Sequence, residues 1–298
     1  MADVWSLGRG EPGYPRSLID LDAIGEHAAP ERVYGRGNRD LLADLEPDRA
    51  VTIVGARRSS PYGRVVAAEL AGSLAAAGLV VVSGMAYGID TAAHRGALEA
   101  GGTTLAVLAC GADRAYPPSA RSLYRRIVAG GAVVSESPPG YSPARWDFPR
   151  RNRIMAALAA MTVVVEARDP SGSRITADRA LQLGRDVGGV PGAVSSPLSA
   201  GPHSLIRDGA VLVRGAQDVL DQILGVGEIE AERIGAALDQ ECTRALGAVG
   251  EEGSSLAGVA ERAGLEPPRA AVALARLELL GYVRAEAGQY SGTGLRPP

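Results

Sequence analysis

From residue 50 onward, short and nearly continuous apolar runs alternate with longer stretches that have helical spacing. The runs have the length of strands, and the stretches between them have the length of helices. Strands are predicted over 51–55, 79–83, 104–108, 132–135, 162–166, 186–190 and 210–213. Helices are predicted over 62–77, 91–100, 119–129 and 152–160. Apolar strands separated by helices predict a doubly wound α/β fold, with a mostly parallel sheet covered on both faces.

The pattern changes on either side of this region. Residues 1–48 contain few periodic stretches, so we interpret them as a short N-terminal extension of an α/β domain that spans 49–224. Residues 225–236 are rich in Gly and Glu and form a predicted linker. The last segment, 237–298, has the element order of a small winged-helix domain. Its predicted helices and hairpin cover 237–248, 255–263, 268–280 and 281–290.

Composition restricts the class of protein. A hydrophobic content of 46% is ordinary for a globular domain. The longest apolar runs have about eight residues, which is too short to span a bilayer, and the first residues lack the basic start of a signal peptide. Cys110 and Cys242 lie far apart and suggest a reducing compartment without a disulfide framework. We therefore expect a cytoplasmic protein without a membrane partner.

Charge is distributed unevenly along the chain. The net charge of −3 argues against a polyanionic partner, but residues 51–216 carry 18 arginines against 11 acidic residues. Residues 217–266 carry 3 arginines against 11 acidic residues. A basic middle between acidic flanks favours a focused anion site, because the local field depends on local charge. The chain has no lysine, which excludes Schiff-base chemistry and a lysine-dependent P-loop.

Small residues follow four of the predicted strands. The loops are 55–60, 83–90, 110–113 and 171–176. In doubly wound folds the carboxyl ends of the strands form the ligand site, and glycines there let a ligand approach the backbone. The helices that follow supply free N–H groups for anions. None of these loops matches G-x-G-x-x-G, so we expect no nicotinamide or flavin cofactor.

The densest group of candidate ligands lies between residues 145 and 153. Guanidinium groups bind phosphate oxygens bidentately, and flat rings stack on unpaired bases. The group contains Arg145, Trp146, Phe148, Arg150, Arg151, Asn152 and Arg153. It opens the helix predicted at 152–160, where the helix dipole would add to anion binding. The pattern predicts binding of single-stranded nucleic acid, and the competing interpretation is a solvated basic turn.

Candidate catalytic groups are few. His27, His94 and His203 have no metal-ligand spacing, and the chain has no Cys-x-x-Cys pair, so we predict no metal site and no catalytic residue. We interpret His94 as a structural hydrogen-bonding residue. Asp90 is expected to cap its helix or to orient Arg95. Ser59 and Ser60 precede a proline and are interpreted as a turn or helix cap.

Several of these motifs together resemble the DprA/Smf family, the DNA-processing proteins of natural transformation. The resemblance covers about Tyr14 to Tyr290, with the motifs in the family's order. They are Ile53-Val-Gly-Ala-Arg57, Val82 to Asp90, Ala93 to Ala97, Tyr116-Pro-Pro, Phe148 to Ile154, Ser171 to Ala177 and Val190-Pro-Gly192. The resemblance implies an extended Rossmann-like core that binds single-stranded DNA, forms a homodimer and loads the RecA recombinase. It also implies a C-terminal winged-helix domain.

The resemblance also implies roles for single residues. By motif position, Arg57 and Arg150 to Arg153 would contact DNA. Around them we place Arg58, Tyr87, Arg145 and Phe148 in the same site, and the phosphate pocket would be lined by Gly55, Ser83, Gly84, Gly88, Ser171, Gly172, Ser173 and Thr176. Tyr87 stands where the family often has a basic residue, so stacking would replace one phosphate contact. Ala157 stands where a Gly is usual, and the chain has no room for the N-terminal helical domain of some members.

Two other functions remain open at this point. The core also resembles the phosphoribohydrolases that cleave a base from a nucleoside monophosphate, which use a Pro-Gly-Gly-x-Gly-Thr loop and a catalytic Glu. The counterpart here runs from Pro170 to Thr176, and no acid follows it before Asp178. The third function is a transcriptional regulator that uses the winged helix. It is disfavoured because the first two helices of that domain are acidic, and only Arg269, Arg276 and Arg284 face phosphates there. We favour a protein contact for this domain.

Overall fold

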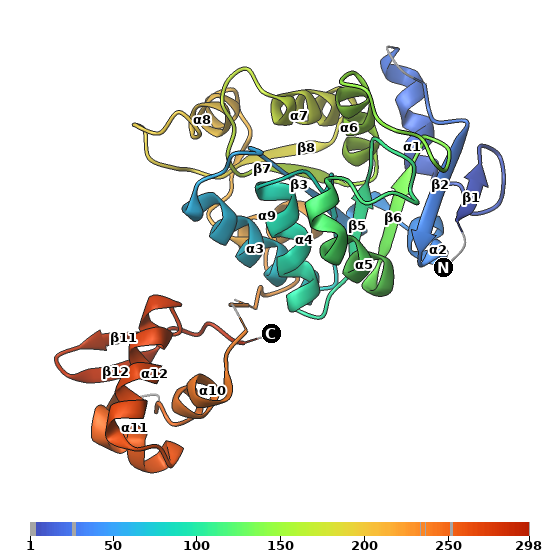
Figure 1. The fold of residues 1–298 in the computed structure, drawn as a ribbon. Helices are drawn as coiled ribbons and strands as arrows, with labels where there is room; N and C mark the ends of the chain where they lie inside the picture. The colour runs from blue at the N-terminus through green and yellow to red at the C-terminus, as the bar shows by residue number, and fades with distance from the viewer. Residues whose placement is uncertain (1–3, 26–27, 233, 236, 251–252, 298) are drawn as a thin grey trace. The chain divides into compact units, whose positions relative to one another are not determined.

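The computed structural model describes residues 4–25, 28–232, 234–235, 237–250 and 253–297, and the chain divides into two compact units, 1–231 and 232–298. Within the described residues of the first unit, nine strands form one sheet (Figure 1). In sheet order they are β1 (Trp5–Gly8), β2 (Arg32–Gly37), β6 (Ala132–Ser135), β5 (Thr104–Val107), β4 (Val80–Ser83), β3 (Ala50–Val54), β7 (Met161–Val164), β8 (Asp186–Gly189) and β9 (Val211–Leu212).

The strands from β6 to β9 are parallel, which confirms the predicted doubly wound α/β fold. Each of the seven coincides with a predicted apolar run. The order reverses at β3, whose neighbours are β4 on one side and β7 on the other. This is the topological switch point, where helices leave opposite faces of the sheet and a crevice opens at the carboxyl ends of the strands.

The first strands of the chain were not predicted. Residues 5–8 and 32–37 form β1 and β2, which pair antiparallel with each other, and β2 continues the sheet antiparallel to β6. Leu7 and Val33 from these strands are buried in the core. Residues 4–25 and 28–48 are therefore part of the same sheet and core, instead of an extension with little regular structure. The strands are short and rich in Gly, and their pairing with β6 is a tertiary contact that local periodicity does not reveal.

Helices cover both faces of the sheet (Figure 1). One face packs against α3, α4, α5 and α9, and the other against α1, α6, α7 and α8. Adjacent residues of β3 show the division, because Ile53 belongs to the first core and Val54 to the second. The helices are α1 (Arg16–Ile19), α2 (Arg39–Ala43), α3 (Pro61–Ala76), α4 (Ile89–Glu99), α5 (Arg121–Gly130), α6 (Asp147–Ala157), α7 (Gly172–Gln182), α8 (Ala200–Arg207) and α9 (Ala216–Leu224).

Three helices and a small sheet make up the second unit. The sheet has the strand order β10-β12-β11. A separate core includes Val259, Leu274 and the fully buried Tyr282. This arrangement is compatible with the predicted winged helix. In chain order the elements are α10 (Gln240–Gly247), β10 (Ser254–Ser255), α11 (Leu256–Ala263), α12 (Pro267–Leu279), β11 (Val283–Glu286) and β12 (Gln289–Gly292).

Among the described residues, no helix combines the length and the apolar character needed to cross a bilayer.

Candidate nucleic-acid interface

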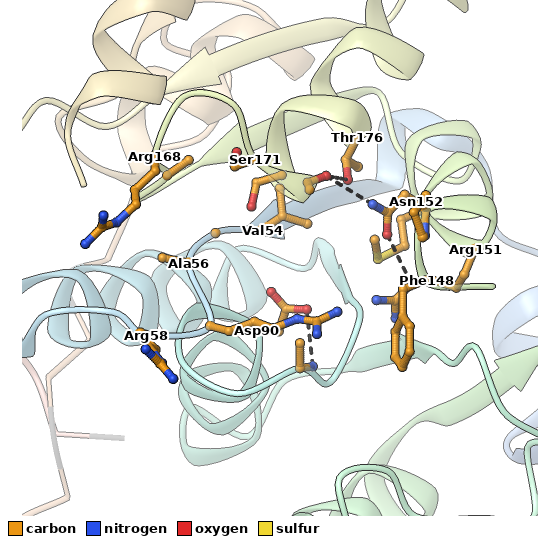
Figure 2. A pocket seen from close by; sticks show the side chains of 18 of the residues that line it. Val54, Ala56, Arg58, Asp90, Phe148, Arg151, Asn152, Arg168, Ser171 and Thr176 are labelled. Carbon is orange, nitrogen blue, oxygen red and sulfur yellow. Dashed lines mark hydrogen bonds between the residues drawn. The ribbon is translucent and has the colours of Figure 1, made fainter. Parts of the chain in front are cut away.

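A cavity of about 870 Å³ lies at the switch point, where the carboxyl ends of β3 and β7 meet α6 and α7 (Figure 2). Its position is the one that the doubly wound topology favours for a ligand. Most of the predicted site residues line it. They are Gly55, Arg57, Arg58, Arg145, Phe148, Arg151, Asn152, Ser171, Gly172, Ser173 and Thr176. Gly84 and Tyr87 line a smaller adjoining pocket.

Four exposed arginines give the cavity its charge. They are Arg57, Arg58, Arg145 and Arg168. In the part of the chain that the structure describes, none of the four forms an ion pair. Arg58 and Arg168 follow β3 and β7 and lie on different sides of the cavity (Figure 2). Because their guanidinium groups are exposed and not neutralised, the cavity is suited to a ligand with several phosphates.

Arg168 was absent from the predicted site. It lies two residues past the predicted strand 162–166, at the same edge of the sheet as the predicted loops. The available signal was its position at the carboxyl end of a central strand. The search for small residues and arginine clusters did not select it, because Arg168 stands alone beside Asp169 and Pro170.

Aromatic rings border the arginines. The guanidinium carbon of Arg57 lies 4.9 Å from the centre of the Phe148 ring, which is a cation–π contact. The rings of Tyr116 and Phe148 lie 5.5 Å apart with a tilt of 46°. Phe148 is the only phenylalanine in the chain. Phosphate-binding cations therefore lie directly beside surfaces on which bases stack.

The first turn of α7 faces the same cavity. Ser171 caps this helix, since its Oγ accepts a hydrogen bond from Arg174 N, and a Cβ on Gly172 would meet no other atom within 4 Å. Asn152 fixes the turn by donating from Nδ2 to Gly172 O at 3.1 Å. Free N–H groups at the start of an eleven-residue helix add a partial positive charge to the arginine-lined wall.

Arg151 is buried and serves the interior of the site. Its Nη1 donates to the carbonyl oxygens of Gly84 (2.7 Å) and Val107, at the ends of β4 and β5, and its Nε donates to Asn152 at 3.2 Å. A Cβ on Gly84 would overlap this guanidinium, so a glycine is required there. Burial lowers the pKa of Arg151 to about 10, which leaves it charged at neutral pH. Arg151 thus joins two strand ends and keeps one buried charge in the cavity wall.

Asp90 is the carboxylate among the described residues that line the cavity. Its Oδ2 accepts a hydrogen bond from Ala86 N at 3.3 Å, and no bond to Arg95 is present, so the expected orienting role toward Arg95 is wrong. Burial raises the pKa of Asp90 to about 6, against the opposing effects of Arg151 and Arg57. The group is therefore close to its titration point at neutral pH.

Asp90 makes anion binding dependent on pH. A phosphate in the cavity is repelled by the ionised carboxylate, so its binding raises the pKa of Asp90 further and takes up a proton. Affinity for a short single-stranded oligonucleotide should therefore fall about fivefold or more between pH 5.5 and pH 8. Asp90→Asn should remove most of this dependence. Anisotropy titrations at fixed ionic strength measure it, and equal pH dependence in both proteins would contradict the placement of phosphate near Asp90.

Two predicted phosphate ligands have structural roles instead. Ser83 is fully buried and donates from Oγ to Ile53 O at 2.6 Å, which ties β4 to β3. Gly88 has a φ of +81°, and a Cβ there would meet the carbonyl oxygens of Ala56 and Arg57. It therefore permits the loop after β4 to pack against the loop after β3. Neither residue lines the two pockets described above.

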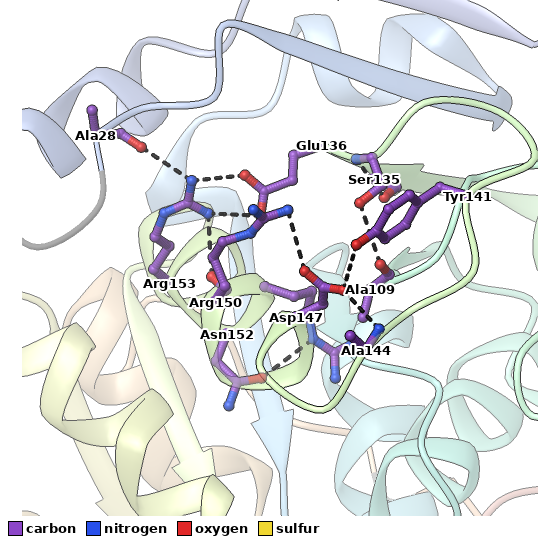
Figure 3. Close-up of polar contacts among 12 residues, drawn as sticks. Ala28, Ala109, Ser135, Glu136, Tyr141, Ala144, Asp147, Arg150, Asn152 and Arg153 are labelled. Atoms are coloured by element: carbon purple, nitrogen blue, oxygen red, sulfur yellow. Dashed lines mark hydrogen bonds and ion pairs between the residues drawn. The ribbon is translucent and has the colours of Figure 1, made fainter.

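Arg150 and Arg153 point away from the cavity (Figure 3). Arg153 is buried and forms a bidentate pair with Glu136, at 2.8 and 3.1 Å, and it also donates to Ala28 O. Arg150 contacts Glu136 at 3.0 Å and Asp147 at 3.5 Å. The structure therefore separates the predicted arginine cluster into two groups. Arg145 and Arg151 line the cavity, whereas Arg150 and Arg153 are engaged with carboxylates.

The division follows from where α6 begins. The helix starts at Asp147, five residues before the predicted start at Asn152, so the arginines lie inside it and not at its N-terminus. The prediction that this helix dipole supports anion binding was therefore wrong, and α7 supplies that feature. Arg150 and Arg153 are three residues apart and share a helix face, while Arg151 lies about 100° around the axis and faces the cavity.

The described histidines have structural partners. His94 is fully buried, and its Nδ1 lies 2.7 Å from Thr104 Oγ1. Because Thr104 donates its own hydrogen to Val81 O, His94 donates from Nδ1. Burial lowers the pKa of His94 to about 3, so the ring is neutral. His203 contacts Gly192 O through Nε2, and His27 lies outside the described residues.

Fold and site together define a Rossmann-like protein with an arginine-lined candidate anion site at its switch point. Comparison with known proteins gives the family. The chain belongs to the DNA recombination-mediator protein A family, whose model matches residues 5–224. It is similar to the putative DNA processing protein DprA of Mycobacterium tuberculosis, with 44% identity over 84% of this chain and 65% of that protein. It is also similar to the DNA processing protein DprA of Streptococcus pneumoniae, with 42% identity over 70% of each chain.

Solved structures agree with this assignment. The structure of DNA processing protein A from Streptococcus pneumoniae has a TM-score of 0.68 and 40% identity, and covers 74% of both chains. That of DNA processing protein A from Helicobacter pylori, which is described as giving insight into a single-stranded DNA binding mode, has a TM-score of 0.64 and 28% identity over 75% of this chain and 98% of that one. The chain spans about two thirds of the length of the mycobacterial relative.

Proposed function

We propose that this protein binds single-stranded DNA in the cavity at the switch point and acts as a recombination mediator. The observation that carries the proposal is the set of four exposed arginines without ion pairs among the described residues, beside Phe148 and Tyr116. The arginines suit successive phosphates, and the rings suit unpaired bases. The Helicobacter pylori relative, described as binding single-stranded DNA, supports this choice of ligand.

A comparison of single- and double-stranded DNA of equal length tests the proposal. Fluorescence anisotropy with a labelled oligonucleotide should show tighter binding of the single strand at every salt concentration. The logarithm of the association constant should fall linearly with the logarithm of salt concentration, by about 0.7 per phosphate contacted. Equal affinity for both forms would mean that the bases are not recognised, and the proposal would fail.

The family resemblance extends the proposal to partners. We propose that the protein forms a homodimer and loads the RecA recombinase onto single strands in the cytoplasm during natural transformation. Sedimentation velocity should then give about twice the monomer mass of 30.6 kDa. Strand exchange by RecA on DNA covered with a single-strand binding protein should begin faster when this protein is present. A monomeric mass or an unchanged lag would remove the corresponding part of the proposal.

We also propose that the protein has no catalytic activity of its own. In the described lining of the cavity, Asp90 is held by Ala86 N and faces Arg151, and no histidine lies beside Ser173 or Thr176. A phosphoribohydrolase needs an acid positioned over the bound nucleotide, which this lining does not offer. Release of a base from nucleoside monophosphates at enzymatic rates, with loss of this activity in Ser173→Ala, would establish the alternative function.

The second unit is proposed to contact protein. Two arginines of α12, the helix that would enter a DNA groove in a winged helix, are paired with acids of α10 or its cap. Arg269 pairs with Glu241, and Arg276 pairs with Asp239. Exposed apolar side chains on α12 include Val272 and Leu279. Neutralised arginines beside exposed apolar groups suit a protein surface better than a phosphate backbone.

Removal of the second unit should therefore leave single-strand binding intact. A protein that ends at Ala231 keeps the complete sheet and both cores of the first unit. Its dissociation constant for an oligonucleotide should stay within about threefold of that of the full chain, because the cavity and its arginines are unchanged. A loss of tenfold or more, with the circular dichroism spectrum of a folded α/β domain, would show that the second unit belongs to the DNA site.

A further inference from the structure

A second, smaller pocket adjoins the arginine-lined cavity. It has a volume of about 80 Å³, and both spaces share Arg57, Tyr116, Phe148 and Arg151 as walls. A site for one water molecule needs about 10–15 Å³ of such space, so this pocket has room for roughly five to eight water-sized groups. That is the scale of one nucleobase and too small for a nucleotide with its sugar and phosphate. A ligand that fills it must also extend into the larger cavity.

The pocket wall has the chemistry of a stacking surface. Tyr87, Tyr116 and Phe148 contribute rings, and Leu108 and Pro117 contribute apolar side chains. Arg57 and Arg151 are the charged groups of the described lining, and no carboxylate belongs to it. Aromatic faces and guanidinium groups attract the π-face of any base, whereas they offer no chain of acceptors for a metal ion or an amine.

The two tyrosines present exposed ring surface. The exposed fraction is 52% for Tyr87 and 41% for Tyr116, whereas Phe148 is only partly exposed and already contacts Arg57 and Tyr116. The Tyr87 hydroxyl is hydrogen-bonded to Ser119 Oγ at 2.9 Å, which holds the ring at the pocket wall. A ring that is fixed before binding loses less conformational entropy when a base stacks on it.

The backbone holds Tyr87 at this wall. It lies between Met85, a buried residue with a φ of +55°, and Gly88, with a φ of +81°. A non-glycine residue in the left-handed region costs about 1 kcal/mol or more, and such conformations concentrate at ligand sites. The loop after β4 is thus folded so that the Met85 side chain enters the core while Tyr87 stays at the surface.

We propose that this pocket, lined by Tyr87, Tyr116 and Phe148, is a nucleobase subsite in which one base of the bound strand stacks while its phosphates lie on the neighbouring arginines. The inference rests on the proposed function, since it assigns the base side of the same ligand. Its chain-specific element is Tyr87, whose ring takes part in base recognition. The subsite accepts any base, because it is built from π-faces and not from a fixed set of donors and acceptors.

Oligonucleotides with and without bases test the subsite. We would compare an oligothymidylate with an oligomer of equal length built of abasic residues, so that the number of phosphates is the same. Stacking contributes roughly 1–3 kcal/mol per base, so Tyr87→Ala and Tyr116→Ala should each weaken oligothymidylate binding by about fivefold or more. Neither should change the affinity for the abasic oligomer by more than about twofold. Tyr87→Phe keeps the ring and should retain most of the affinity.

Tyr62→Ala is the matched control, because Tyr62 is exposed to a similar extent (51%) but lines neither pocket. It should leave both affinities unchanged. Equal losses on both oligomers, or no loss on either, would overturn the base subsite while phosphate binding remained. Failure of the unsubstituted protein to bind either oligomer would instead overturn the proposed function.

Discussion

The double substitution Arg57→Ala, Arg145→Ala is expected to weaken the binding of single-stranded DNA by about 100-fold. Both side chains are exposed, line the cavity and form no ion pair among the described residues, so each is available for phosphate. A hydrogen bond to a charged group contributes about 1.5–3 kcal/mol, and two such contacts are lost. The salt dependence should become shallower by about 1.4, which is 0.7 for each contact. Anisotropy titrations over a range of salt concentrations measure both quantities.

The control for this experiment is Arg121→Ala, Arg125→Ala on α5. These arginines are exposed but do not line the cavity, and the substitution changes the net charge of the protein by the same amount. It should reduce affinity by less than about threefold and leave the slope unchanged. Similar losses in both double variants would mean that the general charge of the first unit, and not the cavity, attracts DNA.

The parallel part of the sheet was predictable because its strands are buried on both faces. Runs such as 51–55 and 162–166 are apolar without interruption, and only a covered parallel sheet accepts that pattern over so few residues. The edge strands β1 and β2 differ, since their burial is partial and Gly35 and Gly37 interrupt β2. Their strand character comes from pairing with β6, about 100 residues later, which no local pattern contains.

The position of the candidate site was predictable, but the tasks of its arginines were not. Topology alone places the loops after β3 and β7 at one edge, and there the structure brings together Arg57, Ser171 and Thr176. Which arginine of the cluster at 150–153 faces the cavity depends on the first residue of α6 and on Glu136, which lies on another element. Helix boundaries are the least certain part of a prediction from sequence, and a shift of one residue turns a side chain by about 100°.

The pairing of Arg150 and Arg153 with Glu136 gives these arginines a role in stability. The Glu136 and Arg153 side chains are 13% and 6% exposed, so the pair is largely shielded from water. Arg153 has further acceptors in Ala28 O and Arg150 O, which join the N-terminal segment to α6. Removing one partner of such a pair leaves an uncompensated buried charge, a loss of about 3–5 kcal/mol.

Glu136→Ala should therefore lower the free energy of unfolding of the first unit by about 3 kcal/mol or more. Both tryptophans, Trp5 and Trp146, belong to this unit, so tryptophan fluorescence during urea denaturation reports on it alone. Glu136→Gln keeps an acceptor for Arg153 and should cost less, and Glu136→Leu combined with Arg153→Met should recover much of the loss, because no charge remains buried. The folded Glu136→Gln protein should bind single strands as the unsubstituted protein does. A marked loss of affinity with unchanged stability would show instead that Arg150 and Arg153 leave Glu136 to contact DNA.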